Sequence, residues 1–245
     1  MNYFTDAVAW LLDPSHYPGP TGIPTRLGEQ LLFTAVTLAL ASVIAIPIGF
    51  LIGHTGRGRG IAVETSGGLR AIPTLGLLTL VALWIGIGLG APYVALTVLV
   101  IPPILAGAYT GFEAVNRATI DAARAVGMTE LQIVRHVEIP LGLPLLIGGL
   151  RSATLQVVAT ATLAAYVADF GLGRFLFAGL KTNDYAQMLG GSILVILLAL
   201  VLEGLFAGLQ KLVVPRGVAA GRPPVDRKAS TRRRPGMEPA ITKGI

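Results

Sequence analysis

Long apolar blocks separated by short polar connections dominate the pattern along this chain. Residues 31–53 contain no charged side chain. At about 1.5 Å per residue, a helix of that length crosses the ~30 Å hydrocarbon core of a bilayer. A second charge-free block runs from residue 71 to residue 112 and is long enough for two crossings. We expect it to fold back at the glycine-rich residues 85–92.

Two further apolar blocks follow a polar loop at residues 113–142 and are separated by a polar linker at residues 168–184. Pro47 lies inside the first block, where membrane helices tolerate proline. Composition agrees with a membrane protein, since 13% of the residues are charged, against about 25% in soluble domains. The pattern predicts an all-α membrane protein with five transmembrane helices, at residues 31–53, 71–89, 93–112, 143–167 and 185–209.

Three regions are expected along the chain. Residues 1–26 are rich in aromatic residues and proline, which predicts an external interfacial segment with a short helix near residues 7–12. Residues 27–214 form the transmembrane domain. Residues 215–245 carry the net charge of +6 in a tail that we expect to be disordered. Its Arg232–Arg234 either bind the anionic headgroups of membrane lipids or stay solvated. Because the rest of the chain is neutral, no nucleic-acid-binding surface is indicated.

Basic residues in the short loops predict the orientation in the membrane. Arg57, Arg59 and the loop at residues 113–142 fall on the same side as the basic tail, whereas the hairpin at residues 85–92 has no charge. Lys and Arg accumulate in cytoplasmic loops. We therefore expect the loop and the C-terminus in the cytoplasm and the N-terminus outside.

The polar loop carries helical signals of its own. Asp121, Ala122 and Ala123 form a small-residue helical turn. Gly127 follows at a position where the helix can end, because glycine accepts the left-handed conformation that terminates helices. These residues predict a first short helix on the membrane surface.

A second short helix is expected directly after it. Thr129–Gln132, which includes Glu130, matches the capping box S/T-x-x-E/Q that begins helices. Ile139, Pro140 and Pro144 then mark the return to apolar sequence. The segment from residue 121 to residue 144 therefore predicts a compact helix-turn-helix.

This spacing resembles the E-A-A-x(3)-G-x(9)-I-x-L-P loop in the permeases of binding-protein-dependent ABC importers. Residue 121 is Asp rather than Glu, and Pro140 directly follows Ile139. The resemblance implies that the loop at residues 113–144 holds the coupling helix, which docks on separate ABC ATPase subunits. It also implies the fold of a type I ABC importer permease, like that of methionine permeases.

Residues 156–165 and the glycines at 171, 173 and 179 are similar to the osmoprotectant branch of this family, with Asp169–Phe170 as one departure. That branch imports glycine betaine, choline and carnitine. The resemblance implies an inner-membrane permease subunit that forms the translocation path with a second permease, either another copy or a homologous chain. An external substrate-binding protein would deliver the solute.

Enzyme and cofactor motifs are absent from the sequence. There is no Walker A sequence, so we expect a transporter subunit without enzyme activity, with ATP and Mg²⁺ bound by the partner ATPase. His16, His54 and His136 lack metal-ligand spacing, so no metal site is expected. The aromatic residues do not cluster along one span, which leaves selection of a quaternary ammonium to the binding protein.

Four polar residues inside the predicted spans are candidates for the translocation path. Arg151 and Glu203 lie at comparable depths, and charged groups inside a membrane face a cavity or a partner. They predict either a structural ion pair or a direct part in translocation. Thr160 and Thr162 either bond to carbonyls of their own helix or line a path.

Two pairs of glycines four residues apart allow helices to approach closely. The pairs, Gly107 with Gly111 and Gly204 with Gly208, predict packing either within the chain or between two subunits.

Two alternative functions stay open at this point. One is an ABC importer permease for another small solute such as methionine. The other is a secondary transporter or channel that works without ATP, for which internal repeats would be expected and are not found.

Overall fold

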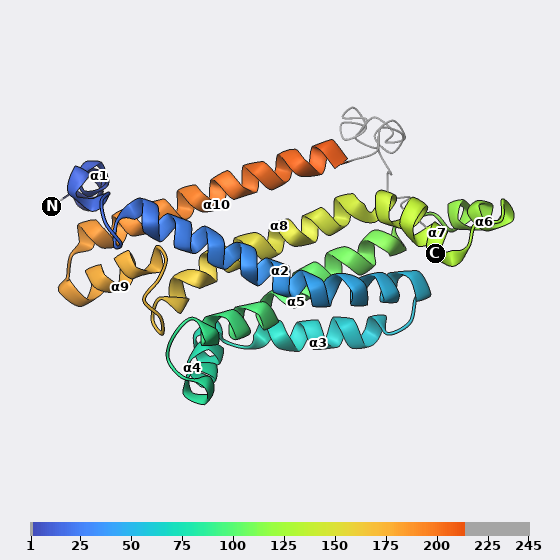
Figure 1. The fold of residues 1–245 in the computed structure, drawn as a ribbon, viewed down its shortest axis with the longest axis horizontal. Helices are drawn as coiled ribbons and strands as arrows, with labels where there is room; N and C mark the ends of the chain where they lie inside the picture. Colours follow the sequence, from blue (N-terminus) through green and yellow to red (C-terminus); the bar gives the residue numbers. More distant parts are fainter. Residues whose placement is uncertain (1, 214–245) are drawn as a thin grey trace, which may run out of the picture. The chain divides into compact units, whose positions relative to one another are not determined.

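The computed structural model describes residues 2–213, so the predicted basic tail lies outside the described residues. Four long helices have roughly aligned axes: α2 (Ile23–Thr55), α5 (Gly90–Glu113), α8 (Ile139–Ala164) and α10 (Tyr185–Val213) (Figure 1). Each is long and apolar enough to cross a membrane. The described part of the chain contains helices and no strand, which confirms the all-α prediction.

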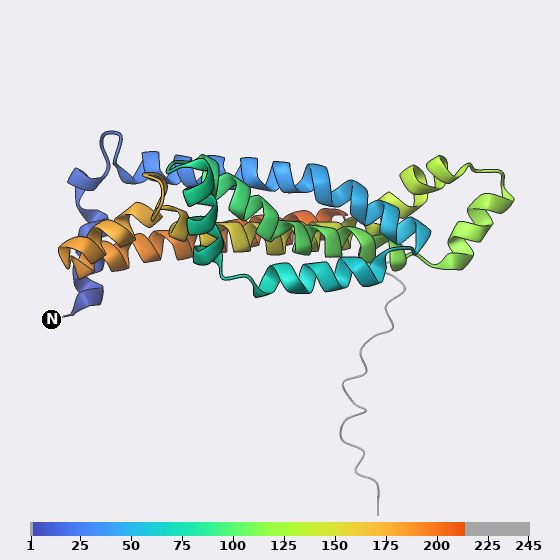
Figure 2. The ribbon, with the colours of Figure 1, turned by 90° about the horizontal axis from the view of Figure 1, so that it is seen from below.

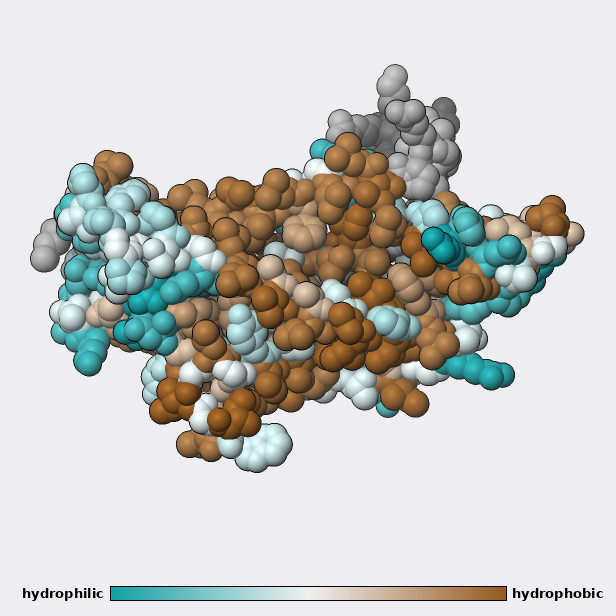
Figure 3. All heavy atoms as spheres, viewed as in Figure 1, coloured by the Kyte–Doolittle hydropathy of each residue, from teal (hydrophilic) through white to brown (hydrophobic). Residues whose placement is uncertain are grey.

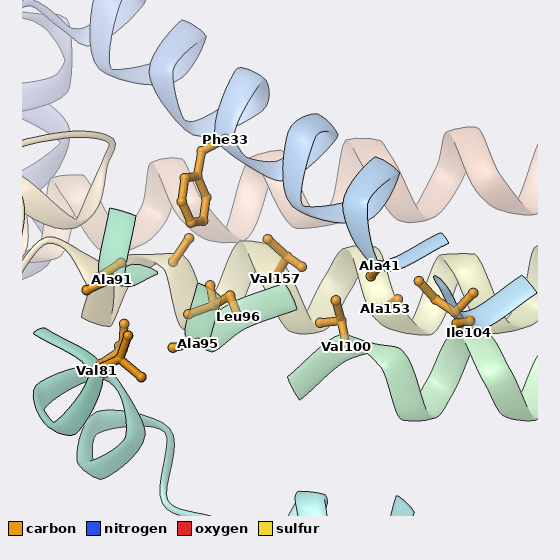
Figure 4. Packing of buried hydrophobic residues seen from close by; sticks show 14 of the residues in the cluster. Phe33, Ala41, Val81, Ala91, Ala95, Leu96, Val100, Ile104, Ala153 and Val157 are labelled. Carbon is orange, nitrogen blue, oxygen red and sulfur yellow. The ribbon is translucent and has the colours of Figure 1, made fainter. Parts of the chain in front are cut away.

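Helix α5 is the central helix of the bundle. Of its most apolar stretch 72% is buried, against 6% for α10. It packs against α2 and α8, and fully buried alanines line these contacts, among them Ala41 of α2, Ala95 of α5 and Ala153 of α8 (Figure 4). Lipid tails are as apolar as side chains, so membrane helices gain from close packing more than from burial, and small residues permit that packing.

Glycines bring the backbones of α5 and α8 into direct contact. A Cβ atom added at Gly107 would lie 2.8 Å from the Cα atom of Gly149, and one added at Gly111 would lie 2.6 Å from the carbonyl oxygen of Gly142. The glycine pair of α5 therefore packs within the chain. A Cβ atom added at Gly204 or Gly208 of α10, in contrast, would have no neighbouring atom within 4 Å among the described residues.

The predicted second span at residues 71–89 is wrong in its form. Two helices occupy this part of the chain, α3 (Arg59–Ala71) and α4 (Thr74–Ile85), and they meet at an angle of 86°. Ile72 is extended, with ψ of 125°, because Pro73 disfavours the helical conformation of the residue before it. The predicted hairpin after α4 is confirmed, with positive φ at Gly86 and Gly88.

Three other boundaries differ from the expected ones. Helix α1 (Tyr3–Leu12) confirms the short N-terminal helix, but α2 begins at Ile23, so the expected external segment ends inside a helix. The predicted fourth span ends at Ala164, three residues early. The linker at residues 168–184 contains α9 (Gly173–Thr182), because its apolar residues, such as Phe175, are buried in the bundle.

The polar loop holds α6 (Arg117–Ala125), α7 (Glu130–Ile133) and the π-helical turn η2 (Val134–Glu138). These elements lie at one end of the bundle, and α1 and α9 lie at the other (Figure 2). Hydrophilic residues cover both ends, and a hydrophobic band lies between them (Figure 3). This distribution suits a chain whose middle lies in hydrocarbon and whose ends lie in water.

We expect Gly111→Val to destabilise the bundle by about 1–3 kcal/mol, the usual cost of overpacking, because the new side chain meets the backbone of α8. Gly204→Val is the matched control, since it adds the same side chain to a transmembrane helix where no neighbour lies within 4 Å. Thermal unfolding of the purified chain in detergent measures both. Equal midpoints for the two variants would contradict the packing described here.

Candidate functional site: the coupling loop

The first helix of the loop is held at both ends. Asn116 caps α6, where its side-chain oxygen accepts a hydrogen bond of 2.9 Å from the backbone N–H of Ala118. Gly127 follows the helix with φ of 87°, the left-handed conformation expected for the residue that ends it. Ile120 and Ala123 are buried, whereas Asp121 and Ala122 are exposed. The small-residue turn therefore presents one face to the interior and one to solvent.

The second helix of the loop begins with the predicted capping box. The backbone N–H of Thr129 donates to the Gln132 side chain at 2.8 Å, and the backbone N–H of Gln132 donates to the Thr129 hydroxyl at 3.4 Å. Glu130 is the first helical residue. Two backbone N–H groups that have no partner within the helix are thereby satisfied, which confirms the predicted capping box.

The expected separation between this second helix and the following span is wrong. Residues 130–164 form one helical run through α7, η2 and α8. In η2 the N–H of Ile139 bonds to the carbonyl of Val134, five residues back. Pro140 has no N–H to give to the carbonyl four residues back, and the wider π turn accommodates this within the helix. Pro144 likewise lies inside α8, so the loop and α8 are joined without a break.

An ion-pair network fastens the two short helices to each other. The Arg124 guanidinium donates to both carboxylate oxygens of Glu130, at 2.8 and 3.1 Å, and to Asp121 at 3.3 Å. The hydrogen bond from Arg124 lowers the pKa of the Glu130 carboxyl, and the same contact raises the pKa of Arg124. Glu130 is thus held in its ionised form beside Arg124.

His54, which the sequence analysis considered only as a metal ligand, joins the loop to α2. It lies in the last turn of α2, and its Nδ1 atom is 2.6 Å from a carboxylate oxygen of Glu138, a side chain with 1% exposure. Its Nε2 atom is 3.4 Å from Glu130. His54 and Glu138 are 84 positions apart, so no local pattern could have paired them.

Arg151 and Glu203 form an ion pair between α8 and α10. The Arg151 Nε atom donates to Glu203 at 2.7 Å, and a second guanidinium nitrogen also contacts the carboxylate. Gln210 completes the group, with its amide donating to the carbonyl of Pro144 at 3.0 Å. Both charged side chains are about one-third exposed and line a hollow of about 340 Å³ with Ser152. The structure therefore brings these two sequence candidates together.

The two threonine candidates bond to their own helix. The Thr160 hydroxyl donates to the carbonyl of Gln156 at 2.7 Å, and the Thr162 hydroxyl donates to that of Ala159 at 2.6 Å. This is the packing interpretation of the sequence. A part in lining the path stays a prediction.

Comparison with known proteins identifies the family of this chain. Residues 31–217 match the family described as the binding-protein-dependent transport system inner membrane component, which spans well over half of the chain. The chain belongs to this family. It is a multi-pass inner-membrane permease subunit of an ABC importer and is not an enzyme.

Among its relatives are permeases of the osmoprotectant branch. The permease is 30% identical over 193 residues to the glycine betaine/carnitine/choline transport system permease protein OpuCB of Bacillus subtilis, covering 79% of this chain and 89% of that one. It is 28% identical to the osmoprotectant import permease protein OsmW of Salmonella typhimurium, covering 87% and 99%.

A solved structure shares the fold. The permease superposes on a chain of the MetNI methionine ABC transporter in an inward-facing conformation, with a TM-score of 0.67 and 26% identity, covering 77% of this chain and 94% of that chain. This confirms the predicted type I ABC importer fold.

At the opposite end of the permease, α2 holds the segment between α8 and α9. The buried amide of Gln30 accepts a hydrogen bond from the N–H of Leu172 at 3.3 Å and donates to the carbonyl of Val158 at 3.2 Å. Arg26, also buried, donates to the Asp169 carboxylate at 2.9 Å. Asp169, one of the two residues that depart from the osmoprotectant-branch pattern, is thus paired with Arg26. The sequence did not reveal this pair because the two residues lie more than a hundred positions apart.

We expect Glu203→Gln to lower the stability of the assembled permease, because it leaves the Arg151 guanidinium in the membrane without its anion. The cost is at most about 3 kcal/mol, since the pair is partly exposed. The charge-swapped double variant, Arg151→Glu with Glu203→Arg, is expected to recover part of it. Thermal unfolding of the assembled complex measures the loss of stability and its recovery, and solute uptake then shows whether transport is affected. Normal assembly with lost uptake in Glu203→Gln would contradict a structural role.

Proposed function

We propose that this chain is the permease subunit of an ATP-driven importer of quaternary-ammonium osmoprotectants such as glycine betaine, choline and carnitine. The observation that carries the proposal is the similarity to OpuCB, whose name includes these three solutes and of which the chain covers 89%. OsmW, whose name includes osmoprotectant import, supports the same class of solute.

In this proposal the loop at residues 113–144 docks on an ABC ATPase subunit, which binds ATP and Mg²⁺. Its outer surface suits such a contact. Val126 and Leu131 are 79% and 77% exposed, so their apolar side chains are available to a partner. Val126 borders a hollow lined also by Gly127, Gln132 and His136. A small rigid element with exposed apolar side chains can transmit force from a partner.

The proposed orientation places this loop and the C-terminus in the cytoplasm and the N-terminus outside. Arg57, Arg59 and three arginines of the loop support it, because basic residues accumulate in cytoplasmic loops. A second permease, either another copy or a homologous chain, forms the path with this one, with Thr160 and Thr162 on a helix that we propose lines it. An external binding protein selects the solute.

The transport step follows from the helix continuity of residues 130–164. ATP binding draws the ATPase subunits together, and each loop moves with its ATPase partner. Since no break separates the loop from α8, the movement reaches the membrane directly and tips the path between inward- and outward-facing states.

Purification of the tagged chain from its native membrane in mild detergent tests the proposal. We expect a subunit with Walker motifs to co-purify, and the complex in liposomes to take up radiolabelled glycine betaine, choline or carnitine only with its binding protein and ATP. Uptake of methionine but none of the three would overturn the solute class. Uptake by the chain alone without ATP would overturn the importer itself.

A further inference from the structure

Both ring nitrogens of His54 face a carboxylate. Glu138 of η2 lies 2.6 Å from Nδ1, and Glu130 of α7 lies 3.4 Å from Nε2. The histidine itself belongs to the last turn of α2, a transmembrane helix. The His54 side chain therefore connects α2 with α7 and η2, two elements of the coupling loop.

The protonation state of the ring decides whether both contacts can exist. A neutral imidazole carries one N–H, so it donates to one carboxylate and turns a lone pair towards the other. Only the doubly protonated ring donates to both.

The surrounding charges leave Glu138 dependent on His54. Glu138 is 1% exposed, and His54 is its one side-chain partner among residues 2–213. A buried carboxylate without a partner is costly, so the contact is tightly held. Glu130 is also bound by Arg124. Arg59, at the start of α3, and Glu113, at the end of α5, pair with each other at 3.5 Å.

We propose that His54 is a positioning residue that fastens the coupling loop to α2 through Glu138 and Glu130, so that ATP-driven movement of the loop reaches α2 as well as α8. The contact with Glu130 is lost when the ring loses its second proton, which weakens this attachment. The inference rests on the proposed function, since it needs an ATPase to move the loop. It adds a proton-sensitive attachment that the helix continuity of residues 130–164 does not provide.

The sign of the pH effect follows from the donors. The attachment is complete at low pH, where the ring is a cation, and loses one of its two carboxylate contacts as pH rises. Glu130 is released rather than Glu138, because Glu130 has Arg124 as a second partner and Glu138 has none among the described residues. Helix α2 then still holds η2 through Glu138 but no longer holds α7.

Solute transported per ATP hydrolysed, measured against pH with the complete importer in liposomes, tests this. For the unmodified complex we expect the ratio to fall several-fold between about pH 5 and about pH 8, the range in which histidine side chains ordinarily change charge. His54→Arg, which keeps several donors and a permanent charge, should give a flat profile. His54→Gln should have a low ratio at every pH. His16→Gln is the control, because His16 lies outside the coupling loop and its Nδ1 atom is 2.8 Å from the backbone carbonyl of Trp10, and it should follow the unmodified profile.

Tryptic cleavage of the loop at one fixed pH gives a second, activity-free readout. The loop contains Arg117, Arg124 and Arg135, and we expect cleavage in the assembled complex to be several-fold faster for His54→Gln than for the unmodified chain. Equal cleavage rates, or a pH profile of the unmodified complex that is flat or shared by His54→Arg, would overturn the inference. A complex that lacks an ATPase would instead overturn the proposed function, so the two failures are distinguishable.

Discussion

Direct backbone contact between helices is the constraint on which the rest of this permease depends. Inside hydrocarbon there is no hydrophobic gain in pressing one apolar helix on another, so α5 and α8 stay together because glycines remove the side chains between them. Gly111 and Gly142 approach so closely that neither position has room for a methyl group. This contact fixes α8 within the core, and α8 is also the helix that leaves the membrane to become the coupling loop.

The loop and its attachments lie at one end of this bundle (Figure 2). The loop is stiff because each of its short helices is capped and because Arg124 ties Glu130 to Asp121. Besides the chain connection to α5, it is attached to the membrane helices through the continuous run into α8 and through His54 to α2. The run into α8 is covalent and independent of pH. The attachment to α2 consists of contacts between His54 and two carboxylates, and in our proposal the contact with Glu130 depends on one proton.

Local signals in the sequence predicted much of this structure, and long-range contacts account for what was missed. Several of these signals appear as expected, namely the apolar sequences of α2, α5, α8 and α10, the glycine that ends α6 and the capping box at Thr129. The bend at Pro73 was missed because apolar length alone was used to define the second span. The continuity through Pro140 was missed because a π turn, which absorbs the proline, has no sequence signature. The partnership of His54 with Glu138 joins positions 84 apart.

Electron–electron distance measurement between spin labels can show whether the loop and α8 move together. The chain has no cysteine, so labels at Thr119→Cys on α6 and Ser152→Cys on α8, both exposed positions, report alone. The labelled chain is diluted with unlabelled chain in the complete importer. We expect the mean distance between the two labels of one chain to be the same in the nucleotide-free complex and in the ATP-bound complex. A shift of about 5 Å, one helical turn, would show that the loop moves independently of α8 and would contradict direct transmission through this helix.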